Sequence, residues 1–316
     1  MKKSLIAVAA LAVVSAASAQ SSLNVYGIVD VVIHKDKGVS TKMTSGGVST
    51  SRLGFKGTED LGGGLKANFL LEQGIDLTSG ALKGNGFDRQ AYVGLSGGFG
   101  EVKFGNVYTA YDDISGATNP VFDSVLSPTN VWSSGGYISN PGSNIYYATP
   151  SFGGFSGAVS YNLDGKKEPV VSVHVKYENG PIYVGAAYQD DRDYAGIYNT
   201  AKGLTGDDAK AAVRYARLNG SYDLGSFKLL AGYGKVSGGV QEYSFGADVP
   251  LAANLVLSAG VASSKTDGAK RLTGYSVGAA YLLSKRTTVY GGFYADNGDA
   301  PDTIESRFGA GIKHAF

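Results

Sequence analysis

The chain has 316 residues, with 28 lysines and arginines against 27 aspartates and glutamates, so its formal charge is only +1. This balance gives no basis for binding nucleic acid, which requires a concentrated basic surface. The chain has no cysteine, which excludes a disulfide scaffold, and no apolar run reaches the roughly 18 residues of a membrane-spanning helix.

The N-terminus has the pattern of a secretory signal. Lys2 and Lys3 precede an apolar run over residues 5–14, and small residues follow at positions 17–19. An anchoring helix is the alternative, but the apolar run is too short to cross a bilayer. We therefore expect residues 1–19 to be a cleaved signal peptide of an exported protein and residues 20–316 to form one domain.

From Leu23 onward the chain divides into about sixteen segments of alternating apolar and polar residues. The expected strands are 23–34, 50–58, 64–74, 87–96, 100–108, 143–149, 154–162, 170–178, 181–189, 210–222, 226–236, 240–248, 255–264, 271–282, 286–295 and 304–316. Their connections alternate between tight and long, and the longest are 35–49, 75–86, 109–141 and 190–208. An antiparallel barrel that spans an outer membrane is built in this way, with short periplasmic turns, long external loops and both termini at the short-turn end.

The alternation also predicts which side chains face the lipid. In the first strand every second residue from Leu23 to Ile33 is apolar or glycine, whereas Asn24, Asp30 and His34 lie on the opposite face. A soluble sandwich alternates too, but a barrel this wide turns its apolar face outward and keeps a polar lumen. Near Arg217 the phase breaks, which indicates a bulge and leaves the face of that side chain open.

Glycine and tyrosine are the abundant residues, with 47 and 21 copies. The glycines lie inside alternating segments, where they are expected if the sheet curves strongly or if backbones approach closely. The tyrosines lie mainly in strands or beside their ends, where an amphipathic ring suits a membrane boundary.

Catalytic and metal sites are not indicated. The three histidines have no local context that resembles a nucleophile motif, and no triad can be assembled from the sequence. His34 and His174 are far apart along the chain, and cysteine ligands are lacking, so we expect neither a metal nor another cofactor. The chain is predicted not to be an enzyme.

Several stretches resemble the general diffusion porins of Gram-negative bacteria. Residues 51–67 resemble the second hairpin of that family, residues 89–105 the next hairpin, and residues 144–155 the sixth strand and its turn. The resemblance implies a homotrimer of sixteen-stranded barrels in the outer membrane, in contact with its lipids, that passes ions and small hydrophilic solutes. His314 and the final Phe316 are similar to the C-terminal signal that the outer-membrane assembly machinery reads.

The resemblance also implies a constriction. The connection 109–141 corresponds to the third loop, which folds into the lumen, and it carries Asp112, Asp113 and Asp123 with no basic residue. Arg52 and Arg89 fall on inward faces and match the wall arginines of the family. An acidic loop opposite a basic wall sets a transverse field that orients solutes and biases ion passage. Alternatively, the two arginines only solvate the lumen and pair with carboxylates.

Further lumen charges are expected from Lys56, Lys66 and Lys103, the last two nearer the periplasmic turns. Many relatives carry another wall arginine before the sixth strand, but residues 139–144 here contain no basic residue. We expect a weak preference for anions. Two other functions stay open: a channel selective for a sugar or an organic acid, and a surface adhesin that binds through loops such as 190–208.

Overall fold

The computed structural model describes residues 22–163, 165, 169–191, 213–298 and 304–316. The expected signal peptide, most of the loop 190–208 and the start of the expected strand 210–222 lie outside these residues. The strands are β1 (Ser22–Asp36), β2 (Lys42–Ser45), β3 (Arg52–Gly62), β4 (Leu65–Gly74), β5 (Gln90–Gly97), β6 (Gly100–Asn106), β7 (Asn144–Ala148), β8 (Phe155–Asn162), β9 (Val171–Asn179), β10 (Ile182–Asp190), β11 (Arg214–Asp223), β12 (Lys228–Val236), β13 (Val240–Ala252), β14 (Leu255–Lys265), β15 (Leu272–Leu282), β16 (Thr287–Asp296) and β17 (Ser306–Ala315).

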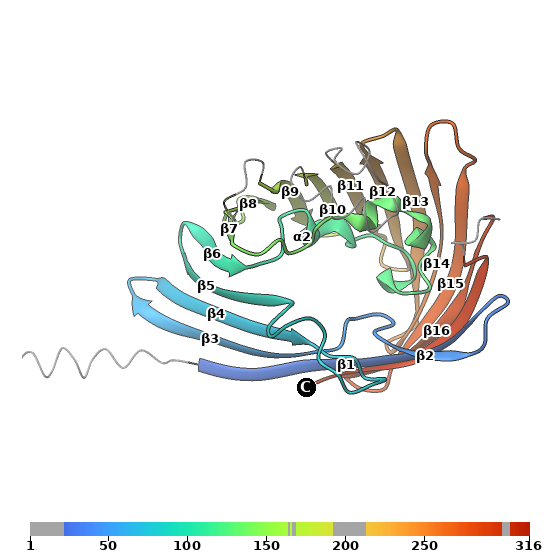
Figure 1. Cartoon of the computed structure of the whole chain (residues 1–316), viewed down its shortest axis with the longest axis horizontal. Coiled ribbons are helices and arrows are strands. Elements are labelled where there is room, and N and C mark those ends of the chain that lie inside the picture. The colour runs from blue at the N-terminus through green and yellow to red at the C-terminus, as the bar shows by residue number, and fades with distance from the viewer. Residues whose placement is uncertain (1–21, 164, 166–168, 192–212, 299–303) are drawn as a thin grey trace, which may run out of the picture.

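The strands close into an antiparallel barrel (Figure 1). From β3 to β17 each strand pairs with the next one along the chain, and β1 pairs with β3 on one side and with β17 on the other. At the seam, Gly27 and the final Phe316 exchange two backbone hydrogen bonds of 3.1 Å. The predicted barrel of sixteen strands is confirmed.

β2 is an additional short strand that was not predicted. It pairs with β1 beyond the end of β3. Val31 of β1 pairs with Ser45 at one end of β2, and His34 of β1 pairs with Lys42 at the other. The first long connection therefore folds back on β1 before it enters β3. Four residues are too few for the alternating pattern to identify a strand.

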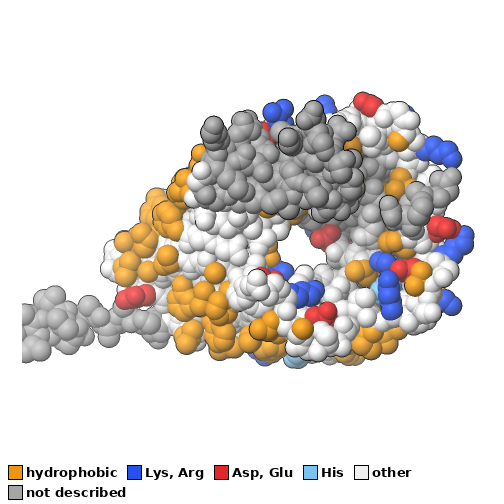
Figure 2. Space-filling model, in the orientation of Figure 1, with side chains coloured by type: hydrophobic (Ala, Val, Ile, Leu, Met, Phe, Trp, Pro, Cys, Tyr) orange, Lys and Arg blue, Asp and Glu red, His pale blue; other side chains and the backbone are white. Residues whose placement is uncertain are grey.

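Alternation separates an apolar outer face from a polar inner face, as predicted. On β1, Leu23 and Val25 are 68% and 57% exposed, while Asp30 and His34 on the inner face are buried. Figure 2 shows apolar side chains on the outer wall and an opening through the molecule with charged side chains at its rim. Such an outer face is costly to expose to water and is typical of a barrel that crosses a membrane.

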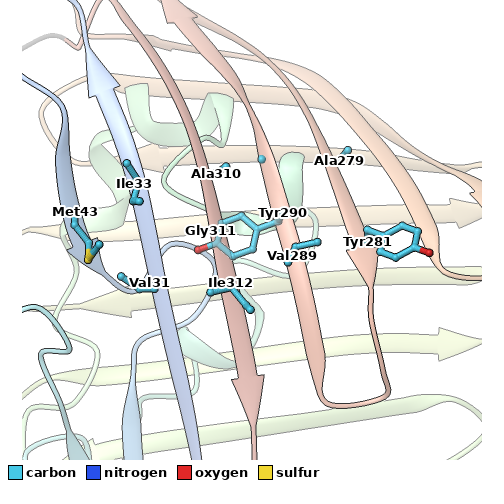
Figure 3. Close-up of a pocket in the computed structure, with 11 residues that line it drawn as sticks. Val31, Ile33, Met43, Ala279, Tyr281, Val289, Tyr290, Ala310, Gly311 and Ile312 are labelled. Carbon is cyan, nitrogen blue, oxygen red and sulfur yellow. The ribbon is translucent and has the colours of Figure 1, made fainter.

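The outer wall also has a hollow of about 590 Å³ where β1, β15, β16 and β17 meet (Figure 3). It lies over the small residues Ala279, Gly291 and Ala310, and larger apolar side chains such as Ile33 and Ile312 rim it. The ring of Tyr290 belongs to the other side of the wall, because its hydroxyl donates to buried Asp30 at 2.5 Å.

Two predictions about regularity are wrong. Arg217 is not at a bulge: β11 pairs without a register shift on both sides, and Arg217 faces inward and is buried. Arg214 lies on the outward face at the end of β11 and pairs with Asp190 at 3.2 Å. A charged residue on the apolar face interrupts the alternation in the sequence, although the strand itself is regular. The connections also do not alternate strictly, because the turn from Val236 to Val240 is short although it lies at the external end.

The helices of the described residues all lie in the connection from β6 to β7. They are α2 (Asp112–Ser115) and the 3-10 turns η1 (Val121–Asp123), η2 (Pro128–Val131) and η3 (Ser133–Gly136). None of the helices in the described part of the chain is long and apolar enough to cross a membrane.

Candidate functional site

The connection from β6 to β7, residues 107–143, is the loop that was predicted to form the constriction, and we name it the constriction loop after that prediction. Figure 1 shows α2 and the turns that follow it inside the ring of strands. Two apolar clusters hold the loop against the inner wall: Tyr111 and Ile114 pack with Tyr215, and Trp132 packs with Tyr294. The inward fold of the third loop is therefore confirmed.

Glycines on the inner wall make room for this loop. A Cβ added to Gly246 or Gly260 would lie 2.6 or 2.5 Å from the ring of Pro120, and one added to Gly278 would lie 2.7 Å from Val121. No side chain fits at such distances without a shift of the loop. The glycines inside strands thus mark close approach, as the sequence predicts.

Serines on the inner wall accept hydrogen bonds from the backbone of the loop. Ser160 accepts from the amide of Ala110 at 3.2 Å, and Ser172 from that of Tyr111 at 2.6 Å. Farther round the wall, Ser258 accepts from the amide of Val121 at 2.8 Å. These bonds satisfy loop amides that the lumen wall shields from water.

Two buried charged residues hold the returning arm of the loop. Glu242 on β13 is fully buried and accepts from the amides of Ser133 and Ser134, the latter at 3.2 Å. Arg217 on β11 donates from Nη2 to the Ser134 hydroxyl at 2.9 Å, and its guanidinium lies 4.4 Å from the centre of the Trp132 ring. Sequence reasoning assigned no role to either residue, although the inward parity of Glu242 was readable from the alternation.

The tip of the loop is held at the seam of the barrel. Arg307 on β17 binds both oxygens of Asp36 on β1, at 2.6 and 3.0 Å. The same guanidinium donates to the carbonyl of Val125 at 3.1 Å, and the amide of Val125 donates to the carbonyl of Gly47 at 2.9 Å. Residues from both ends of the chain thus position the middle of the constriction loop.

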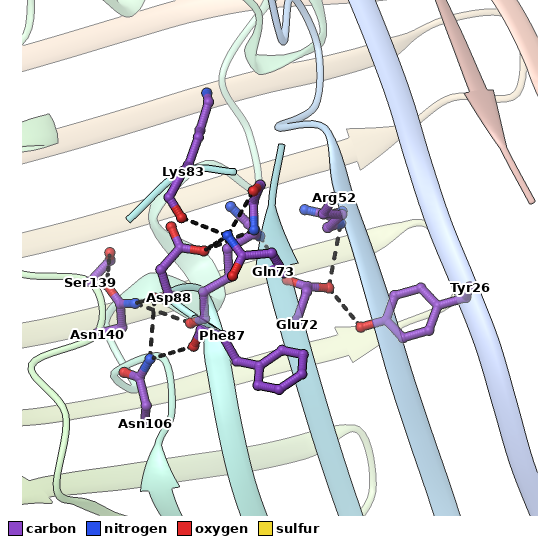
Figure 4. Close-up of polar contacts among 12 residues, drawn as sticks. Tyr26, Arg52, Glu72, Gln73, Lys83, Phe87, Asp88, Asn106, Ser139 and Asn140 are labelled. Carbon is purple, nitrogen blue, oxygen red and sulfur yellow. Dashed lines mark hydrogen bonds and ion pairs between the residues drawn. The ribbon is translucent and has the colours of Figure 1, made fainter. Parts of the chain in front are cut away.

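The exit of the loop is bound to the segment that carries Arg89. The amide nitrogen of the Asn140 side chain donates to the carbonyls of Asp88 and Arg89 at 2.8 and 3.0 Å (Figure 4). Asn106 donates to the same carbonyl of Asp88 at 3.2 Å. Two side chains therefore fix the backbone from which Arg89 projects.

Glu72 joins the two predicted wall arginines. Its carboxylate oxygens lie 2.7 Å from Nε of Arg89 and 3.5 Å from Nε of Arg52. The hydroxyl of Tyr26 donates to the second oxygen at 2.6 Å (Figure 4). Two guanidiniums that share one carboxylate keep a positive excess, because arginine stays charged at any relevant pH. The predicted alternative of pairing with a carboxylate is thus present, but it neutralises only one of the two charges.

A cavity of about 540 Å³ brings Arg89 together with the predicted aspartates of the loop. Arg89, Asp112, Asp113 and Asp123 all line it, together with Tyr108. The guanidinium of Arg89 lies 5.6 Å from the centre of the Tyr108 ring, which orients it along one side. Arg52 does not line this cavity. It contacts Glu72, the carboxylate that also binds Arg89.

Each aspartate of the loop has a hydrogen-bond donor of its own. Asp112 accepts from Tyr137 and Asp113 from Tyr146, both at 2.6 Å, and Asp123 accepts from Asn119 at 2.6 Å. These bonds fix where the carboxylates point.

The protein around the aspartates changes how they ionise. Burial raises the pKa of Asp112 to about 6, against the opposing effect of the hydrogen bond from Tyr137. Burial also raises the pKa of Asp113 and of Asp123, although both side chains contact the lumen. The acidic side of the cavity therefore loses charge in mild acid, whereas the arginine side does not.

The predicted lysines divide between two levels of the lumen. Lys56 and Lys66 line a separate cavity of about 530 Å³ with Asn68 and Glu101. Lys103 was expected near the periplasmic turns, but its ammonium lies 4.9 Å from the ring of Tyr146, the tyrosine that binds Asp113. Its ammonium also lies 2.9 Å from Glu101, so Lys103 lies between that cavity and the constriction loop.

The histidines and the C-terminus occupy separate places. His34 contacts Asp36 at 3.1 Å, while His174 lies 2.7 Å from the carbonyl of Ala110 and 3.4 Å from Asp113. His314 lies on the outward side of β17 and contacts the hydroxyl of Thr287 at 2.9 Å. Phe316 is 47% exposed at the short-turn end of the seam.

Comparison with known families and sequences identifies the protein family of the chain. The family model for Gram-negative porins matches residues 7–301. Outer membrane porin protein 32 of Delftia acidovorans is 33% identical over 359 residues, and the major outer membrane protein P.IB of Neisseria lactamica is 30% identical over 365 residues; both comparisons cover 100% of each chain. The chain belongs to the Gram-negative porin family.

Solved structures agree with this placement. The anion-selective porin from Comamonas acidovorans is 26% identical, with a TM-score of 0.78 over 94% of this chain and 100% of that one. OmpT of Vibrio cholerae shares the fold, with a TM-score of 0.70 at 18% identity over 94% of this chain and 99% of that one. The protein is an outer-membrane porin of a Gram-negative bacterium, a water-filled channel for passive diffusion.

Proposed function

We propose that the cavity between Arg89 and the aspartates of the constriction loop is the selectivity site of this porin. Arg89 forms its basic side, with Arg52 beyond the shared Glu72, and Asp112, Asp113 and Asp123 form its acidic side. The observation that carries the proposal is that one cavity is lined by Arg89 and by all three aspartates. Charges on opposite sides of a narrow, partly desolvated passage bias which ions pass.

The net preference is for anions, and it is weak. The two guanidiniums keep a positive excess over Glu72, and the negative charge of the opposing aspartates keeps the preference small. The anion selectivity named for the Comamonas acidovorans porin supports the same direction.

Reversal potential under a KCl gradient tests the preference. The refolded mature protein in a planar bilayer should give a potential shifted toward that of chloride. A shift toward the potassium potential would assign control of the passage to the aspartates and would contradict the proposal. Channels without any preference would show that the cavity does not select.

The channel is further proposed to work as a homotrimer without catalytic activity. The trimer form of the structurally similar OmpT supports this assembly, and the family supports a channel in place of an enzyme. Conductance should appear in steps of three, and light scattering in detergent should give the mass of three chains. A monomeric mass with single steps would exclude the trimer.

The exposed Phe316 and neighbouring His314 are proposed to be the signal for outer-membrane assembly, and the apolar wall to contact the membrane lipids. Phe316→Ala should lower the amount of folded protein in the outer membrane while refolding in detergent stays normal. Leu283→Ala is the control, because Leu283 is 58% exposed at the same end. Equal loss in both variants would show that only lipid contact matters.

A further inference from the structure

The cavity that Lys56 and Lys66 line is separate from the proposed selectivity site. It has a volume of about 530 Å³ and lies against the inner faces of β1, β3, β4 and β5, and no residue of its lining belongs to the cavity of Arg89. Lys66 is the second residue of β4 after the short turn from β3, so the cavity lies toward the short-turn end of the lumen. Its size suits a small organic molecule.

Two accessible cations give this cavity a positive charge. Lys56 and Lys66 are both exposed to the lumen, and neither pairs with a carboxylate of the residues that the structure describes. Glu101 also lines the cavity, but its carboxylate is already paired with the ammonium of Lys103 at 2.9 Å. An anion can therefore bind the two free ammonium groups without breaking an existing ion pair.

An apolar side chain lies between the two sides of the cavity. Leu70 on β4 pairs directly with Lys56 on one side and with Tyr92 on the other, so the three share the inner face. Leu70 is partly exposed and lines the cavity, and the ring of Tyr92 beside it has the ammonium of Lys103 at 5.3 Å from its centre. A leucine departs from the polar character of a water-filled lumen, and it offers a surface that the apolar part of a solute can cover.

Polar side chains at the other end of the cavity are fixed by one another. The hydroxyl of Thr58 donates to Asn68 at 3.0 Å, and the amide nitrogen of Asn68 donates to the hydroxyl of Ser96 at 2.8 Å. Ser96 thus accepts within this chain and keeps its own proton to donate to a solute. Free donors and unpaired cations favour an anion over a sugar, and Leu70 favours an anion that has an apolar body.

We propose that this cavity binds organic carboxylates with a compact apolar body, of which benzoate is the simplest aromatic example. The carboxylate would lie between Lys56 and Lys66, and the ring would cover Leu70 beside Tyr92. An inorganic anion gains only the first contact, and a neutral aromatic solute only the second. The site adds a saturable step for one class of solute to passive diffusion, and it does not depend on the proposed selectivity site.

The KCl current of the refolded channel in a planar bilayer at neutral pH tests the site, with sodium benzoate, sodium acetate and benzamide as probes. Benzoate should reduce the current in a manner that saturates with concentration. Acetate lacks the ring and benzamide lacks the charge, so each should need about tenfold higher concentration, the effect of losing one partly buried apolar group or one charge-assisted bond. Equal, non-saturating effects of the three solutes would overturn the proposal.

Variants locate the effect. Leu70→Asn should weaken the benzoate effect about tenfold and leave that of acetate unchanged, because only the ring contacts this position. Lys66→Gln should weaken the effects of benzoate and acetate alike, by about tenfold. Lys176→Gln is the matched control, because Lys176 is another partly exposed lysine of the inner wall and does not line this cavity.

Two results would exclude the site. Equal effects of Lys66→Gln and Lys176→Gln would show that only the overall charge of the lumen acts, and a Leu70→Asn channel with unchanged benzoate binding would show that the apolar surface has no role. If Leu70→Asn does not insert, the comparison of the two lysine variants and the series of three solutes still decide. The reversal potential is measured separately, so that failure of ion selectivity and failure of benzoate binding are distinguishable.

Discussion

The two halves of the inner wall differ in a way that the strand pattern alone does not show. The inward side chains of β3 and β4 include the long, charged Arg52, Lys56 and Glu72. Most of those on β13 and β14 are small, such as Gly246 and Gly260, and the exception Glu242 binds the loop. Both halves alternate with the same period. Alternation decides which side chains face inward, but their size decides whether the wall borders water or a packed loop.

The difference has a physical consequence for the passage. The small-residue half is covered by the constriction loop, whose amides and apolar side chains it binds. The charged half borders open space in the lumen, where Lys56 and Lys66 line a cavity. We therefore propose that one half sets the width of the channel and the other its charge, so substitutions in the two halves should have separable effects.

The largest effect is expected from filling the space under the loop. Gly260→Ala places a Cβ 2.5 Å from Pro120, which should push the loop into the lumen, lower the conductance and cost about 1–3 kcal/mol of unfolding free energy. Conductance and thermal unfolding in detergent measure both. Gly220→Ala is the matched control, because its nearest neighbour would be a carbonyl 3.8 Å away. Unchanged conductance in Gly260→Ala would mean that the loop position does not depend on this contact.

Releasing the returning arm should have the next largest effect. Glu242→Ala leaves the amides of Ser133 and Ser134 without an acceptor, at about 1–3 kcal/mol for a buried donor left unpaired. We expect a lower unfolding temperature and more open-channel noise. Glu101→Ala serves as the control, since Glu101 pairs with Lys103. Equal noise in both variants would argue against a role of Glu242 in holding the loop.

On the charged half, selectivity should change while width does not. Arg89→Gln should shift the anion preference toward cations by about two- to fivefold, the effect of one unit charge a few ångströms from a passing ion in water. Arg52→Gln should do less, because Arg52 does not line the cavity. Reversal potentials measure this order, with exposed Arg286→Gln as the control. A larger effect of Arg52 than of Arg89 would reverse the assignment.

The smallest effect is expected from pH. The pKa of Asp112 is raised to about 6, so this carboxylate is ionised at pH 7.5 and largely neutral at pH 5, while the arginines stay charged. The negative side therefore weakens as the pH falls, and anion preference should rise. Asp112→Asn should raise the preference at pH 7.5 and reduce its change with pH. A preference that falls toward pH 5 would contradict the assignment.

The alternation of residues within a strand was sufficient to predict which face of the barrel wall a side chain lies on. Inward Arg52 and outward Val25 follow from a period of two residues, which needs no knowledge of the partner strand. The same reasoning failed near Arg217, where it predicted a bulge although β11 pairs without a register shift. It also failed at β2, which is too short to carry a pattern.

The candidate site depends on contacts between residues far apart in the chain, which the alternation within a strand cannot predict. The sharing of Glu72 by two arginines joins three segments, and the bond from the amide of Val121 to Ser258 joins residues 137 positions apart. Arg217 and Glu242 acquire their roles only from a loop more than 80 residues earlier in the chain.

The sequence by itself determined the membrane barrel, the number of its strands and the face of most side chains, because each follows from alternation between lipid and water. Tertiary structure alone decided the path of the constriction loop, the pairing of the wall arginines and the contacts of Arg217 and Glu242 with the loop. Those features depend on closure of the sheet, which brings Arg307 and Asp36 together from opposite ends of the chain and sets the inner space that the loop must fill.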